Sequence, residues 1–319
     1  MTDVRPFRFG LLGAGVRTAD DLVGTARAAE AAGYATFLLR DHFVEDPFGH
    51  QFAPLVALAA VAGATSTLRV GTLVLDNDYR HPVMLAKEAA TLDRLSGGRL
   101  ELGLGAGWLR AEYEAAGMPF DSAGVRIDRL AESVTVLKGL FAGAPCSVAG
   151  VHYTVTALAG LPTPSQQPHP PLLLAGGARR MLSLAAREAD IVGVLNASVA
   201  SGTVANDPTE LFPETVDRKL GWVREAAGER FGRLELSTVV TVIVAADRPA
   251  AAARYAAERE WTGVPVERVL EMPSVFIGNV AEIADQMRAR RDRFGFSYYV
   301  VGDADLAAFA PVVARLTGR

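Results

Sequence analysis

A carboxylic acid and an imidazole stand side by side immediately after a short apolar run. The run Thr36–Leu39 has the composition of a buried strand, and Asp41 and His42 follow it. Histidine titrates near neutral pH and a neighbouring carboxylate can orient it, so the pair suits proton transfer to or from a bound ring. A purely structural role is also open, in which Asp41 pairs with Arg40 or caps the next helix. We predict that Asp41 and His42 are catalytic and that Asp41 orients His42.

Glycines end a second strand-like run. In LELGLGAGW, residues 100–108, Gly103, Gly105 and Gly107 alternate with other residues. A backbone without side chains can approach a flat ligand closely, although tight turns need glycines for the same reason. The spacing is not the dinucleotide-binding fingerprint, because no third glycine opens a helix at the required offset.

A third run, PLLLAGGARR at residues 171–180, ends in Gly176 and Gly177 before a predicted helix. Free backbone N–H groups and the positive end of the helix dipole favour an anion there. Arg179 and Arg180 add positive charge, although arginines in a first helical turn often face solvent. We predict that this segment binds phosphate.

The stretch after the third strand-like run, GTLVLDND, is unusually long before its helix begins. A β-bulge at Leu73 and Val74 would turn the backbone toward the same site, because bulges at a barrel rim re-aim the chain.

Composition excludes several classes of function. The chain has 319 residues and a net charge of −4, which gives no basic surface for nucleic acid. The longest apolar run, residues 52–64, is shorter than the roughly 20 residues that cross a membrane. The first ten residues lack an apolar signal core, so we expect a cytoplasmic protein. Cys146 is the only cysteine and the histidines lack ligand spacing, so we predict no disulfide and no metal site.

Strand-like and helix-like segments alternate along the whole chain. The predicted strands are 7–12, 36–39, 68–75, 99–104, 171–175, 191–195, 235–245 and 297–302. The predicted helices are 19–32, 52–64, 82–95, 126–141, 179–188, 214–231 and 304–316. Eight apolar strands interleaved with helices predict an α/β fold, a (β/α)8 TIM barrel that forms a single domain over residues 1–319. The irregular stretches 143–170, 196–213 and 261–277 are predicted insertion loops at the carboxyl-terminal face, and we expect them to shape a substrate pocket.

Together these motifs resemble the luciferase-like monooxygenase superfamily, and within it the coenzyme F420-dependent oxidoreductases. The resemblance covers nearly the whole chain. It rests on RDHF at 40–43, the block from RVGTLVLDND to EYEAAG at 69–117, RIDRLAES at 126–133, PLLLAGGARRMLSLAAREAD at 171–190 and VFIGNVAEIADQM at 275–287.

The resemblance implies roles for individual residues. Asp41 and His42 match the acid–base pair beside the cofactor ring, and Leu73–Val74 match a bulge, often a cis peptide, behind the ring. Members often place Ser or Thr before the bulge. Here Thr72 is followed by Leu73, which removes a hydroxyl and leaves the ring contact to the backbone. The other implied cofactor-binding residues are Gly105, Ala106 and Gly107 beside the ring, and Ala175, Gly176, Gly177 and Arg179 at the phosphate.

The resemblance also implies a cofactor and a reaction. F420 is the expected cofactor and the expected reaction is hydride transfer between the deazaflavin and a small organic substrate, in a homodimer. With FMN instead, the protein would be the oxygenase half of a two-component monooxygenase and would take FMNH2 from a flavin reductase. The same motifs would also suit a non-catalytic F420-binding protein, and the strand-end pattern alone would suit an unrelated barrel enzyme without flavin.

Overall fold

Eight parallel strands close into a barrel, so the predicted (β/α)8 TIM-barrel fold is confirmed. The structure is a computed structural model that describes residues 5–198, 202–203 and 206–319. The barrel strands are β1 (Arg8–Leu12), β2 (Thr36–Leu39), β3 (Arg69–Thr72), β5 (Leu100–Gly105), β8 (Leu172–Gly176), β9 (Ile191–Val194), β10 (Glu235–Val239) and β13 (Phe296–Gly302). They follow one another around the barrel as β3-β2-β1-β13-β10-β9-β8-β5, and a β3–β5 pairing closes the ring. The short strand β4 (Leu75–Asp76) continues β3 along β5.

The strands are apolar on both faces because each face is covered. Phe9 and Leu11 of β1 pack outward with the helices in the main core, whereas Leu12 belongs to a separate cluster inside the barrel. Tyr298 and Val300 of β13 join that inner cluster. The barrel centre is therefore filled with side chains, and the space for a ligand lies beyond it, at the strand ends.

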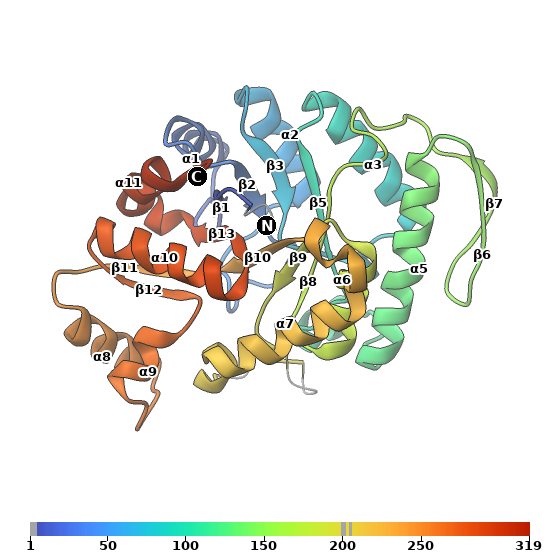
Figure 1. Ribbon diagram of the computed structural model, residues 1–319. Coiled ribbons are helices and arrows are strands. Elements are labelled where there is room, and N and C mark those ends of the chain that lie inside the picture. The colour runs from blue at the N-terminus through green and yellow to red at the C-terminus, as the bar shows by residue number, and fades with distance from the viewer. Residues whose placement is uncertain (1–4, 199–201, 204–205) are drawn as a thin grey trace.

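Helices surround the barrel (Figure 1). They are α1 (Ala19–Ala31), α2 (Pro54–Ala64), α3 (Pro82–Leu95), α5 (Ala123–Phe141), α6 (Arg179–Glu188), α7 (Pro213–Ala227), α10 (Val280–Phe294) and α11 (Leu306–Leu316). A short helix, α4 (Arg110–Ala115), follows β5. Local signals set several ends: Pro82 begins α3, and Asn279 with Glu282 forms a capping box for α10. Within the described residues, no helix is long and apolar enough to span a membrane.

The predicted strand 235–245 is two strands. β10 stays in the barrel, while β11 (Thr241–Val244) pairs outside it with β12 (Val275–Gly278). The predicted loop 261–277 holds α9 (Val266–Glu271) and β12, and α8 (Arg248–Glu258) precedes it. Trp261 and Met272 are buried in a second apolar cluster among these elements. The sequence hides the break because residues 238–244, TVVTVIV, are β-branched throughout.

The segment 143–170, predicted as an insertion loop at the carboxyl-terminal face, forms a hairpin that lies elsewhere. β6 (Pro145–Ala149) and β7 (Thr154–Ala159) pair antiparallel and lie beside α5 at the edge of the molecule (Figure 1). Glu132 of α5 accepts the backbone N–H groups of residues 151, 152 and 153 at 2.8–3.0 Å. The segment connects a helix to the next strand, so it does not follow a strand end that carries ligand-binding residues. Part of the predicted loop 196–213 lies outside the described residues.

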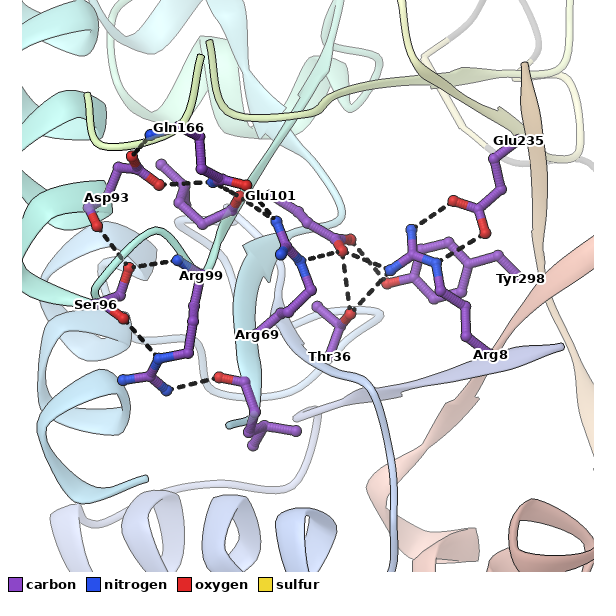
Figure 2. Close-up of polar contacts among 12 residues, drawn as sticks. Arg8, Thr36, Arg69, Asp93, Ser96, Arg99, Glu101, Gln166, Glu235 and Tyr298 are labelled. Atoms are coloured by element: carbon purple, nitrogen blue, oxygen red, sulfur yellow. Dashed lines mark hydrogen bonds and ion pairs between the residues drawn. The ribbon is translucent and has the colours of Figure 1, made fainter. Parts of the chain in front are cut away.

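An ion cluster closes the opposite, amino-terminal end of the barrel (Figure 2). Glu101 of β5 is 2% exposed, pairs with Arg8, and accepts from Nε of Arg69 at 2.7 Å. Arg8 also pairs with Glu235 at 2.6 Å and lies 3.7 Å from the centre of the Tyr298 ring. Burial alone raises the pKa of Glu101, but the charges of Arg8 and Arg69 outweigh it, and the pKa falls below its usual value.

Candidate active site

A cavity of about 460 Å³ opens at the carboxyl ends of the strands, where TIM barrels carry their sites. Segments after β2, β4, β5, β8, β9 and β10 line it. It brings together most of the residues predicted from the sequence: Asp41, His42, Leu73, Val74, Gly105, Ala106, Gly107, Ala175, Gly176 and Gly177. The segments 196–213 and 261–277 reach it through Asn196, Ser198, Leu211, Ser274 and Val275, whereas no residue of 143–170 lines it. The expectation that 143–170 shapes the pocket is therefore wrong.

Thr72 and Arg179, also predicted to bind cofactor, do not line the cavity. The Thr72 hydroxyl is buried between two strands, donates to the Gly103 carbonyl at 2.8 Å and accepts the Gly103 N–H at 3.0 Å. Arg179 is 62% exposed and pairs with Glu225 at 3.1 Å. Thr72 is therefore held in a contact between two strands, and Arg179 faces solvent from the first turn of α6.

The segment after β8 nevertheless has the form of an anion site. Gly176, Gly177 and Ala178 line the cavity directly before α6. The N-cap residue, Ala178, provides no side-chain hydrogen bond to the first turn of α6. Any anion here would therefore meet backbone N–H groups and the helix dipole rather than the two arginines.

His42 is oriented by Glu112 of α4. Its Nδ1 lies 3.0 Å and 3.1 Å from the two carboxylate oxygens of Glu112, which is 1% exposed. An ionised carboxylate only accepts, so Nδ1 donates, and Nε2 is the nitrogen left to exchange a proton in the cavity. Phe48 packs against the imidazole at 4.7 Å between ring centres, and Trp108 at 5.9 Å.

Glu112 is held as a carboxylate. It accepts from the backbone N–H of Phe43 at 2.7 Å and from the hydroxyl of Tyr79 at 3.0 Å, besides His42. Burial raises the pKa of Glu112, but the hydrogen bond and charge of His42 and the N–H groups of Val44 and Phe43 outweigh it, so the pKa lies below its usual value.

Asp41 does not orient His42, which corrects the sequence interpretation. Both of its carboxylate oxygens bind the guanidinium of Arg80, one at 3.0 Å, and Oδ2 also accepts the N–H of Asp76 at 3.1 Å. Asp41 does not pair with Arg40 either. It ties the end of β2 to the segment after β4, and it lines the cavity.

The peptide between Leu73 and Val74 is cis, as the family resemblance implied. Both side chains line the cavity. A Cβ at Gly105 would lie 2.7 Å from Cγ2 of Val74, so only glycine lets β5 approach this peptide so closely.

Gly107 packs directly against the buried, hydrogen-bonded pair of Asp76 and Tyr113. Its φ is +71°, and a Cβ there would lie 1.9 Å from the Tyr113 hydroxyl and 2.4 Å from Oδ2 of Asp76. The Tyr113 hydroxyl donates to Asp76 at 2.8 Å. Burial is the main cause that raises the pKa of Asp76 to about 7. Asp76 lines the cavity, so a carboxyl group that titrates near neutral pH lies at the site.

Arg126 of α5 holds the loop that follows β5 in place. Its guanidinium donates to the carbonyls of Ala106 at 3.1 Å and Gly107 at 3.3 Å and also to Asp121, and it lies 4.1 Å from the ring centre of Phe120. Arg126 is 5% exposed.

The sequence reasoning missed Glu112, Asp76, Arg126 and Arg40 as site residues. All four lie inside blocks that carried the family resemblance, but no local spacing distinguishes them from surface charges. Among the described residues, no group of three or more His, Cys, Asp or Glu side chains could hold a metal ion.

The model of the family described as luciferase-like monooxygenase matches residues 5–309. The chain belongs to the luciferase-like monooxygenase family. One protein to which the chain is similar is the F420-dependent hydroxymycolic acid dehydrogenase of Mycobacterium tuberculosis, 35% identical over 54% of this chain and 48% of the relative. Another is the FMNH2-dependent dimethylsulfone monooxygenase of Pseudomonas putida, 29% identical over 52% of this chain and 46% of the relative. The chain spans about half the length of the curated relatives it matches.

Solved structures with the same fold superpose over nearly the whole chain. The F420-dependent tetrahydromethanopterin reductase from Methanopyrus kandleri superposes with a TM-score of 0.75 at 18% identity, over 98% of this chain and 100% of that chain. The EDTA monooxygenase of Chelativorans sp. BNC1 superposes with a TM-score of 0.76 at 16% identity, over 99% and 95%. At these identities the likeness concerns the fold alone. Of the two relatives described above, one is named a dehydrogenase and the other a monooxygenase.

Proposed function

We propose that the chain is a coenzyme F420-dependent oxidoreductase that transfers a hydride between the deazaflavin and a small organic substrate. The observation that carries the proposal is the His42–Glu112 pair, whose Nδ1–carboxylate distance is 3.0 Å at the edge of the cavity. Hydride transfer to or from an alcohol, carbonyl or alkene carbon needs a proton donor or acceptor beside it, and an oriented imidazole is suited to that role. The F420-dependent dehydrogenase relative supports the same reaction class.

The residues of the cavity fit such a cofactor. The Leu73–Val74 segment and the glycine-rich backbone at 105–107 both line the cavity, so a flat ring can lie against main chain there. The anionic tail would meet the backbone of Gly176 and Gly177 and the start of α6. The cofactor, when bound, supplies the carbon that gives or receives the hydride.

The chain itself supplies proton transfer and positioning. In the proposed reaction, Nε2 of His42 gives the proton to the substrate oxygen or takes it away, while Glu112 keeps Nδ1 protonated and stabilises the imidazolium that forms in one direction. Phe48 and Trp108 pack around the imidazole and restrict its rotation and the access of water.

Titration of the purified protein with F420 and, separately, with FMN tests the cofactor, with ligand fluorescence as the signal. We expect saturable F420 binding and no FMN binding. Turnover is then measured with a panel of alcohols against F420 and of carbonyl and alkene compounds against reduced F420. F420 binding without turnover across the panel would indicate a non-catalytic cofactor-binding protein.

The second candidate is an FMNH2-dependent monooxygenase that works with a separate flavin reductase. It is favoured by relatives whose names carry that activity, such as the dimethylsulfone monooxygenase. In this case the titration gives FMN or FMNH2 binding without F420 binding, and oxygen consumption depends on an added flavin reductase.

We also propose that the chain forms a homodimer through α2 and α3. α2 carries no charged residue, and its Val56 is 76% exposed, while Met84 and Leu95 on the neighbouring α3 are 54% and 68% exposed. Sedimentation should give a dimer, and Val56→Asp should yield monomers. Val151→Asp, on the β6–β7 hairpin and 90% exposed, is the matched control and should stay dimeric.

A further inference from the structure

Arg40 is a cation at the cavity that has no acidic ion-pair partner within the described part of the chain. It follows β2 directly and lines the cavity beside Asp41 and His42. The carboxylate of Asp41 pairs with Arg80 and that of Glu112 pairs with His42, so neither of them forms an ion pair with Arg40. Among the described residues, no side chain forms an ion pair or hydrogen bond with the Arg40 guanidinium.

The environment of Arg40 is partly dehydrated. Its guanidinium carbon lies 4.4 Å from the centre of the Phe48 ring. Burial lowers the pKa of Arg40 to about 10, and the charge of Asp303 offsets only part of that effect. The Asp303 carboxylate itself accepts the Gly15 N–H at 2.7 Å.

A guanidinium removed from water without an anion is unfavourable, so the free site is set up to gain from binding one. Arginine carries five N–H donors in a planar fork, and this fork matches the two oxygens of a carboxylate. The other arginines that line the cavity do not offer a partly dehydrated guanidinium with free donors. Arg126 donates to backbone carbonyls, and Arg259 is exposed and lies near the Tyr255 ring, where water screens its charge.

An anion bound by Arg40 would lie close to His42, the proposed proton donor, and away from the segment proposed to hold the cofactor tail. The guanidinium carbon lies 4.4 Å and the His42 ring 4.7 Å from the centre of the same Phe48 ring, so the two groups are at most the sum of these distances apart. The Gly176–Gly177 segment follows β8, and β3 and β5 separate β8 from β2 around the barrel.

We propose that Arg40 binds a carboxylate group of the substrate and thereby places the reacting carbon beside His42. The substrate class is a small organic acid, and this inference rests on the proposed function for the reaction that follows binding. A single guanidinium balances one carboxylate, whereas a phosphate dianion would leave a negative charge uncompensated beside Asp303.

Matched acid and amide probes test the site without knowledge of the substrate. Benzoate is compared with benzamide and hexanoate with hexanamide, because each pair has the same size and differs in charge; inorganic phosphate is the third probe. Affinities are measured calorimetrically on the purified protein with and without F420. The variant is Arg40→Met, and Arg293→Met, an exposed arginine outside the cavity near the end of α10, is the control.

We expect the wild-type protein to bind each carboxylate about 10-fold or more tightly than its amide, as charge-assisted bidentate hydrogen bonds allow. Arg40→Met should remove this preference, and Arg293→Met should retain it. F420 affinity should stay within about twofold in both variants, because the tail site is separate. If Arg40→Met does not fold, Arg40→Lys keeps the charge but loses the planar fork, and it should reduce the preference severalfold.

Equal affinity for acids and amides in the wild-type protein, or an unchanged preference in Arg40→Met, would overturn the proposal. Phosphate binding that is tighter than carboxylate binding and depends on Arg40 would overturn the substrate class. A loss of F420 affinity in Arg40→Met of about 10-fold would assign Arg40 to the cofactor. If F420 does not bind but the acid preference depends on Arg40, the carboxylate site stands and the proposed function fails.

Discussion

The carboxylate of Glu112 lies 3.0 Å from Nδ1 of His42, although 70 residues separate the two in the chain. Asp41, adjacent to His42 in the sequence, instead binds Arg80. Neighbouring residues on an extended chain point to opposite sides, so Asp41 and His42 face different partners. The proton-transfer pair is thus assembled from the end of β2 and from α4.

The His42–Glu112 pair predicts different effects for its two members. His42→Ala should lower turnover by roughly 100-fold or more, because it removes the proton-transfer group, and should leave F420 affinity nearly unchanged. His152→Ala, on the β6–β7 hairpin, is the control and should match the wild-type protein. Unchanged turnover in His42→Ala would remove the imidazole from the mechanism.

Glu112→Gln should act through the orientation of His42. The amide can donate to Nδ1 and so stabilise the opposite tautomer, which lowers kcat by about 10-fold or more with little change in KM. Glu112→Asp, which keeps the charge, should recover part of the activity. A change in KM alone, or a pH–rate profile identical to that of the wild-type protein, would mean that Glu112 only supports the fold.

Gly107→Ala should disrupt cofactor binding, because its Cβ would collide with Tyr113 and Asp76 below the loop. We expect F420 affinity to fall by about 10-fold or more, measured by fluorescence titration. Gly117→Ala is a matched control with a similar φ of +68° and no atom within 4 Å of the added Cβ. It should cost about 1 kcal/mol of stability and leave binding intact. Equal binding defects in both variants would attribute the effect to backbone strain.

Asp76 should make stability depend on pH near neutrality. Its folded-state pKa of about 7 lies above the unfolded value near 4, so the folded state holds the proton more tightly. The associated stabilisation is present below about pH 4 and is lost as pH rises through about 7.

Asp76→Asn removes this titration. The free energy of unfolding of the variant relative to wild type should therefore increase between about pH 5 and pH 8, by about 1 to 4 kcal/mol. Urea unfolding across this pH range measures it, with the exposed Asp285→Asn as control. A difference that is constant with pH would place the Asp76 pKa near its ordinary value.

Glu101→Gln should destabilise the barrel without affecting the site. It leaves the cations of Arg8 and Arg69 without their shared carboxylate at the closed end, at a cost of about 3 to 5 kcal/mol in the free energy of unfolding. Glu235→Gln, which removes a partner of Arg8 alone and is more exposed, should cost less. F420 affinity should be unchanged, and a large loss of affinity would show that the two barrel ends are coupled.

Much of the fold was predictable because the barrel strands are short apolar runs bounded by helix signals. Pro82 and the glycines after residue 95 bounded α3, and Leu73–Val74 marked the irregular strand correctly. The break between β10 and β11 was not predictable, because β-branched residues continue through it and pairing partners decide which sheet they join.

The sequence by itself determined the alternation of strands and helices, and with it the barrel and the set of turns that meet at its mouth. It therefore located His42, the Leu73–Val74 peptide and the glycine loops correctly at one cavity. Only the tertiary structure decided which charges pair there: Glu112 with His42, Arg80 with Asp41, and Arg40 with no carboxylate among the described residues. Local periodicity fixes which way a strand or helix faces, but ion pairs depend on distances between segments far apart in the chain, and those distances exist only once the barrel has closed.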